Sequence, residues 1–145
     1  MPETLAIASK LRQCAAGIDP AHDLFILDAL LKEAEGQIDT SLRDLKSRED
    51  VDARSTIFLI LRRQKGTGKA LAWVDAEGLG PQNFTAPGAL NLILETIDSG
   101  DYSKALAMMH EVPETYFEDI LVLKLTRAQL KLASILPRDQ KAIVF

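Results

Sequence analysis

The apolar residues of this chain recur at intervals of three and four, and no stretch alternates with period two for long enough to mark a strand. An α-helix completes a turn in about 3.6 residues, so this spacing predicts helices along the whole chain. A chain of 145 residues suits one domain and buries roughly 70% of the surface that it exposes when unfolded. The sequence therefore predicts an all-α fold that forms a single helical domain over residues 1–145.

Glycine and proline mark where the predicted helices end. Each follows an apolar, periodic segment, at the place where a left-handed glycine or a proline commonly stops a helix. The predicted helices end at Gly36, Gly66, Gly100, Pro113 and Pro137. Three helices have clear limits, at residues 2–16, 69–76 and 115–136. Because the loops are short, consecutive helices are expected to pack as antiparallel hairpins.

Side chains suited to capping begin several of these helices. Thr85 and Asp101 each precede an apolar segment and are expected to accept a hydrogen bond from the first turn. Ser47, followed three residues later by Asp50, has the form of a capping box in which aspartate replaces the usual glutamate or glutamine. Residues 77–87, rich in glycine and proline, predict a loop.

The last predicted helix, over residues 115–136, carries one apolar side. This side consists of Ile120, Leu123, Ala128, Leu132 and Ile135. The chain then ends in an apolar segment, residues 141–145, which is typical of a domain cut from a longer polypeptide. Both a complete chain and such a fragment remain open at this point.

Two stretches of the sequence resemble each other. Residues 59–61, Gly66 and residues 69–72 correspond to residues 92–94, Gly100 and residues 104–107, with offsets of 33, 34 and 35 residues. A period in this range indicates stacked helical hairpins, each of which buries its apolar face only against its neighbours. The fold is therefore expected to be repeat- or solenoid-like, with an irregular helical bundle as the alternative.

The turn at Gly100-Asp101-Tyr102, followed by the small residue Ala105, resembles the turn between the paired helices of a tetratricopeptide repeat. The resemblance covers about residues 57–136 and implies stacked helical hairpins. The sequence departs from the family at two positions before this turn. Ile93 stands where the family has a close-packing glycine, and Ala89 stands where it has an aromatic residue.

Charged residues are segregated along the chain. Residues 53–74 contain five basic residues and no acidic one, residues 75–119 contain nine acidic residues against one lysine, and residues 120–145 contain five basic residues against one aspartate. Such blocks either select a charged partner or pair with each other. A nucleic-acid partner is disfavoured, because the net charge is −4 and the basic block lacks interleaved aromatic residues.

The segment Lys65-Gly66-Thr67-Gly68-Lys69 invites comparison with a phosphate-binding loop. It fails the pattern, because Arg63 replaces the first glycine, Ala70 replaces the serine or threonine after the lysine, and a helix precedes it instead of a strand. Two readings remain: backbone N–H groups that hold an anion beside two lysines, and a simple turn between helices.

No arrangement of residues indicates catalysis, a metal site or a cofactor. His22 and His110 lie far apart and form no metal-ligand spacing with other residues. The single cysteine, Cys14, lies on an apolar stripe and is expected to be a buried, inert thiol. We therefore expect no catalytic residue, no metal ligand and no cofactor.

The aromatic and basic residues are the best candidates for contact with a partner. Exposed tyrosine and tryptophan side chains commonly anchor interfaces, although packing inside the fold is the alternative for each. Tyr116 and Phe117 point about 100° apart on one helix, so one layer of neighbours cannot bury both. The candidate partner-binding residues are Arg62, Arg63, Lys65, Lys69, Trp73, Tyr102 and Tyr116.

These features favour a non-catalytic module that binds another protein or a peptide, such as an adaptor or a chaperone-like accessory domain. A regulatory domain of a nucleotide-hydrolysing or other enzyme and a self-assembling structural protein, such as a homodimer, are the alternatives. No apolar run reaches the roughly 20 residues that a membrane span needs. The first residues do not form a secretory signal, so a cytoplasmic location is expected.

Overall fold

The computed structural model describes residues 21–145, with side chains from residue 24, and all regular structure in this part is helical. The elements in chain order are α2 (Ala21–Ala34), α3 (Ile38–Lys46), α4 (Val51–Lys65), α5 (Thr67–Ala76), η1 (Pro81–Asn83), α6 (Ala86–Asp98), α7 (Tyr102–Glu111), α8 (Glu114–Asp119), α9 (Leu121–Ile135) and η2 (Arg138–Val144). The all-α prediction is confirmed. The helix predicted over 2–16, with Cys14, lies outside the described residues, as does the side chain of His22.

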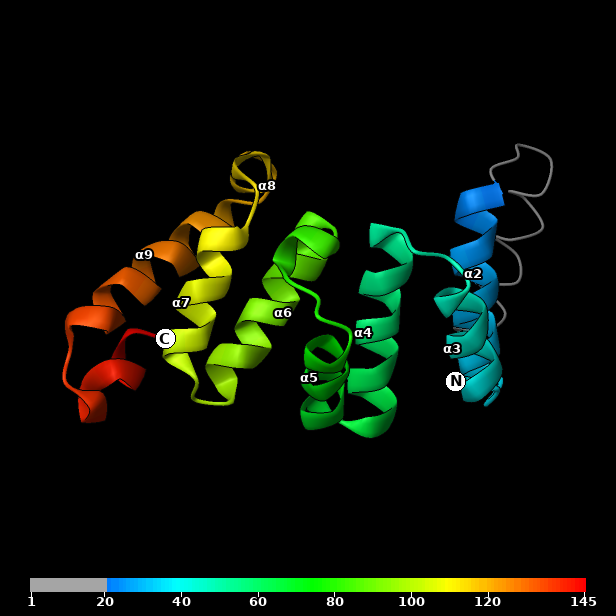
Figure 1. Cartoon of the computed structure of the whole chain (residues 1–145), viewed down its shortest axis with the longest axis horizontal. Coiled ribbons are helices and arrows are strands. Elements are labelled where there is room, and N and C mark those ends of the chain that lie inside the picture. Colours follow the sequence, from blue (N-terminus) through cyan, green and yellow to red (C-terminus); the bar gives the residue numbers. More distant parts are fainter. Residues whose placement is uncertain (1–20) are drawn as a thin grey trace.

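The helices form an elongated row that runs from α2 to α9 (Figure 1). Most helices pack against the next one in the chain, and α2–α3, α4–α5 and α6–α7 form antiparallel hairpins, whereas α7 packs on α9. Contacts also join α2 to α4, α4 to α6 and α6 to α8. Neighbouring hairpins therefore bury their apolar faces against one another, which is how a stack of helical hairpins is stabilised.

The helix ends confirm most of the predicted signals. Gly36, Gly66 and Gly100 have φ angles of 84°, 94° and 87°, a left-handed conformation that glycine adopts without steric cost. Thr85 accepts a hydrogen bond from the backbone N–H of Gly88 at 3.1 Å, and Asp101 accepts one from that of Lys104 at 3.2 Å.

The predicted cap at Ser47 is wrong. Ser47 ends α3 with a helical backbone, and its hydroxyl donates back to the carbonyl of Asp44 at 2.6 Å. Asp50 has an extended backbone and accepts from the N–H of Ala53 at 2.8 Å, so it caps α4 instead. A cap must stand immediately before the first helical residue, and only Asp50 meets this condition for a helix that begins at Val51.

The long helix predicted over 115–136 is interrupted. Ile120 has an extended backbone, with φ −130° and ψ 106°, and separates α8 from α9. Phe117 and Leu123 are both buried, although six residues on a continuous helix would place them about 120° apart. The break at Ile120 allows both side chains to face the interior.

Part of the core lies between α4 and the segment that leads into α6. Phe58 of α4 is buried and makes an edge-to-face contact with Phe84, with ring centroids 6.2 Å apart. Gly88 of α6 is also buried, and a Cβ atom there would lie 2.3 Å from Oγ of Ser55 in α4. Glycine therefore permits the close approach of these two helices, although it does not stand at the position expected from the tetratricopeptide resemblance.

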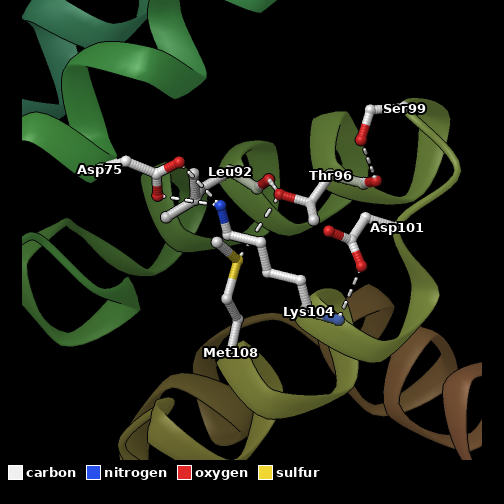
Figure 2. Close-up of polar contacts among 7 residues, drawn as sticks. All are labelled: Asp75, Leu92, Thr96, Ser99, Asp101, Lys104 and Met108. Carbon is white, nitrogen blue, oxygen red and sulfur yellow. Dashed lines mark hydrogen bonds and ion pairs between the residues drawn. The ribbon is translucent and has the colours of Figure 1, made fainter.

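The hairpin of α6 and α7 is fixed by polar contacts on both sides of Gly100 (Figure 2). The buried hydroxyl of Thr96 donates to the carbonyl of Leu92 at 2.8 Å and lies 3.5 Å from the sulfur of Met108, across the hairpin. Lys104 of α7 reaches both carboxylate oxygens of Asp75 in α5 at 2.9 Å. This hairpin is therefore joined both within itself and to the preceding one.

Candidate functional site

Arg62 and Arg63, two of the predicted partner-binding residues, form ion pairs with neighbouring helices. Arg62 donates to Glu95 of α6 at 2.8 Å, and Arg63 donates to both carboxylate oxygens of Glu33 in α2, at 2.6 Å and 3.2 Å. The last turn of α4 is therefore tied to the helices on either side of it. Part of the segregated charge is thus paired within the chain, since Arg62 comes from the basic block and Glu95 from the acidic block.

The carboxylate of Glu33 is mostly buried and fully hydrogen-bonded. Burial by itself raises the pKa of Glu33. Hydrogen bonds from Arg63 and Gln64 and the charge of Arg63 lower the pKa by a larger amount, so it lies below the ordinary value of 4.5. Glu33 is consequently held in its charged form, as expected for a structural ion pair.

The turn that resembles a phosphate-binding loop receives a carboxylate from its own chain. The hydroxyl of Thr67 donates to Glu95 at 3.0 Å, on the same carboxylate that pairs with Arg62. Lys65 and Lys69 are exposed, and neither has an ion pair among the residues that the structure describes. The hydroxyl of Thr67 is thus engaged within the chain, the charge of Glu95 is balanced by Arg62, and both readings of this turn stay predictions.

The three candidate aromatic side chains are all half-buried, and each contacts another part of the fold. Trp73 packs edge-to-face on Phe84, with ring centroids 6.4 Å apart. Tyr102 stacks on Phe145 with centroids 5.4 Å apart, so the apolar C-terminal segment folds back onto α7. The hydroxyl of Tyr116 donates to the carbonyl of Phe84 at 2.6 Å, whereas Phe117 is buried, in agreement with the prediction that one layer cannot bury both rings.

Two of the open grooves on the surface lie beside α4, and Tyr102 lines two further hollows near η2. One has a volume of about 430 Å³ and is lined by Trp73 and Ile57 together with the charged ends of Arg54 and Glu77. The other has a volume of about 530 Å³ and lies between α2 and α4, with a largely aliphatic lining. The candidate residues do not gather in either groove, because only Trp73 lines one of them.

The clearest surface feature is one that the sequence analysis did not single out. Helix α9 buries Leu123, Thr126, Leu130 and Ala133 against its own chain. Its opposite side exposes large apolar side chains, with Leu121 76% exposed, Leu125 58%, Leu132 47% and Ile135 78%.

The exposed side of α9 is a continuous stripe. Together with the exposed Ala128, its members are spaced by four, three, four and three residues, which places all of them on one face of a helix. We call Leu121, Leu125, Ala128, Leu132 and Ile135 the outer stripe. Such exposed apolar patches mark contact sites in proteins.

The predicted apolar side of the last helix is therefore partly wrong. Leu123 is buried as expected, but Ala128, Leu132 and Ile135 are exposed. The cause lies in the sequence of α9, which carries leucine, isoleucine or valine around most of its circumference. The 4-3-4-3 spacing was visible in the sequence, but spacing alone does not tell which of two apolar stripes packs inward.

Within residues 21–145, no group of three His, Cys, Asp or Glu side chains is placed to hold a metal ion. No helix in the same part of the chain combines the length and the apolar character that crossing a bilayer requires. No protein-family model, no curated protein and no solved structure matches this chain.

Proposed function

We propose that this chain is a non-catalytic protein–protein interaction module, an adaptor or chaperone-like stack of helical hairpins that holds a helix of another protein. The outer stripe of α9 is the observation that carries the proposal. Its leucines and isoleucine are about half to three-quarters exposed on a helix that already has a buried side. An amphipathic partner helix that lays its apolar face on this stripe would remove these side chains from water.

The remainder of the stack supports this function by holding α9 in place. Arg62 and Arg63 tie α4 to its neighbours, and Tyr116 ties α8 to the loop before α6. The turn at Gly100, capped by Asp101, supports the proposed likeness of the α6–α7 hairpin to a tetratricopeptide repeat. In this proposal most of the predicted contact residues hold α9 in position and do not touch the partner themselves. That Lys65 and Lys69 contact a partner directly remains a prediction.

Site-specific photo-crosslinking tests the proposal. A photoreactive amino acid is placed at Leu125 in the outer stripe and, as a control, at Ala72, an exposed position on α5. Polypeptides crosslinked in extracts of the source cells are identified by mass spectrometry, produced in pure form and tested for binding to the full chain. We expect a partner that crosslinks at position 125 and whose binding is lost in Leu125→Glu/Leu132→Glu but kept in Ala72→Glu. The proposal is wrong if position 125 crosslinks no polypeptide beyond those found at position 72.

A further inference from the structure

The outer stripe of α9 has two different edges. Lys124 and Lys131, seven residues apart, are both exposed along one edge. Val122 and Gln129, also seven residues apart, lie along the other edge. Since seven residues make almost two full turns, each pair lies one above the other, about 10 Å apart along the helix axis. The apolar stripe is thus flanked by two lysines on one edge and by Val122 and Gln129 on the other, where Gln129 donates to the carbonyl of Val144 at 2.6 Å.

The two lysines differ from the arginine on the same helix. Arg127 pairs with Glu114 at 3.6 Å and lies over the ring of Phe117, with its guanidinium carbon 3.9 Å from the ring centroid. Lys124 and Lys131 have no ion pair among the described residues, and α9 itself contains no aspartate or glutamate. The positive edge of the outer stripe is therefore only partly balanced by its own chain, because Lys131 shares a hollow with Arg127 and with the one carboxylate of Glu114.

We infer that the partner of the outer stripe is an acidic amphipathic helix, with a leucine-rich face and two carboxylates about seven residues apart along one edge. This inference rests on the proposed function and names the chemistry of its partner. The apolar face would cover the outer stripe, and the carboxylates would lie beside Lys124 and Lys131. Complementary charge at the rim of an apolar contact sets the orientation and the choice of partner.

A second copy of this chain fits the surface less well. If two copies of α9 paired in antiparallel fashion about a two-fold axis, the lysine edge of one copy would face the lysine edge of the other, and like charges would repel. In a parallel pair each lysine edge would face Val122 and Gln129, which offer no negative charge. Of these three partners, only an acidic helix would cover the outer stripe and also place negative charge beside Lys124 and Lys131.

Three synthetic helical peptides test the inference against the full chain. They share one leucine face and differ only along one edge, which carries glutamate, glutamine or lysine. In fluorescence anisotropy at low salt we expect the glutamate peptide to bind about tenfold more tightly than the glutamine peptide, and the lysine peptide to bind most weakly. In Lys124→Glu/Lys131→Glu this order should be reversed. Arg43→Glu/Lys46→Glu, which changes the net charge equally at two exposed positions on α3, should keep the original order.

The outcomes separate this inference from the proposed function. If all three peptides bind equally and Leu125→Glu/Leu132→Glu removes binding, the interaction function stands and the acidic partner is wrong. If the control variant reverses the order as well, the preference comes from net charge, and the inference is again overturned. Light scattering that shows a dimer, lost in Leu125→Glu/Leu132→Glu, would assign the stripe to a second copy. Binding of none of the peptides to a monomeric chain would contradict both proposals.

Discussion

Helices α4 and α9 have the same length, fifteen residues each, but they occupy different environments. Helix α4 lies inside the stack and buries residues on several sides, from Ala53 to Leu61, against α2, α3, α5 and α6. Helix α9 packs mainly on α7, α8 and η2 and leaves the outer stripe in contact with solvent. Leucine and isoleucine side chains thus stabilise the fold where they are buried in α4 and form a candidate binding face where they are exposed on α9.

The largest difference in stability between the two regions is expected when an aromatic side chain is removed. Phe58→Ala in α4 removes a buried ring that contacts Phe84 and should lower the free energy of unfolding by about 3–5 kcal/mol. Phe145→Ala at the C-terminal end removes a ring that is 41% exposed and should cost less than about 1 kcal/mol. Urea denaturation of both variants measures the difference, and equal losses would show that the stack has no denser centre.

The second largest effect on stability is expected where α4 and α6 approach each other closely. Gly88→Ala places a Cβ atom against Ser55 and should cost about 2 kcal/mol, because the short serine side chain has little room to move. Gly68→Ala is the matched control, since a Cβ atom there meets nothing within 4 Å. Alanine favours the helix, so this control should raise the free energy of unfolding by up to about 1 kcal/mol. If both substitutions shift the urea midpoint in the same direction, the close approach at Gly88 is not a determinant of stability.

The ion pair between α2 and α4 should make stability depend on pH. Arg63→Ala leaves the buried carboxylate of Glu33 with only Gln64 and should cost about 1.5 kcal/mol at pH 7. Because the pKa of Glu33 lies below 4.5 in the folded chain, the stabilisation is present above pH 4.5 and is lost as the pH falls through the folded pKa. Urea denaturation at several pH values should show the difference from the wild type shrinking below pH 4.5. Arg43→Ala, on the exposed side of α3, should differ little from the wild type at any pH.

The smallest effect among the ion pairs is expected for Lys104 and Asp75. This pair joins α7 to α5 with good geometry, but both side chains are more than a third exposed. Exposed pairs contribute little, so Lys104→Ala should change the free energy of unfolding by no more than about 0.5 kcal/mol. Lys124→Ala, at an exposed lysine that forms no ion pair with any residue of the described part of the chain, serves as the baseline in the same denaturation series. A loss of several kcal/mol in Lys104→Ala would show that hairpin docking depends on this contact.

The fold class and most helix ends could be predicted from the sequence, because they depend on local signals. Apolar spacing, the left-handed glycines and the caps at Thr85 and Asp101 act within a few residues. The break at Ile120 could not be predicted in this way, because it satisfies two buried side chains that contact other helices. The N-cap at Asp50 could be predicted only in part. Either Ser47 or Asp50 could precede a helix by its residue type, and the choice between them requires knowing where α3 ends.

The candidate site was harder to predict than the fold. Their charge or aromatic ring made Arg62, Arg63, Tyr102 and Tyr116 candidates for contact with a partner. In the structure all four make contacts within the chain. Whether an arginine is free depends on carboxylates about thirty residues away, such as Glu33, and the linear sequence does not show such distances. The outer stripe was likewise hidden, because its leucines have the same spacing as those of a buried face.

The outer stripe of α9 should contribute almost nothing to the stability of its own chain. Urea denaturation of Leu125→Glu/Leu132→Glu, beside Leu123→Ala from the buried side of the same helix, measures this contribution. We expect the double variant to unfold within about 0.5 kcal/mol of the wild type. We expect Leu123→Ala to lose about 2–5 kcal/mol. If the double variant loses as much as Leu123→Ala, the outer stripe is already covered in the folded chain, and the proposed binding face does not exist.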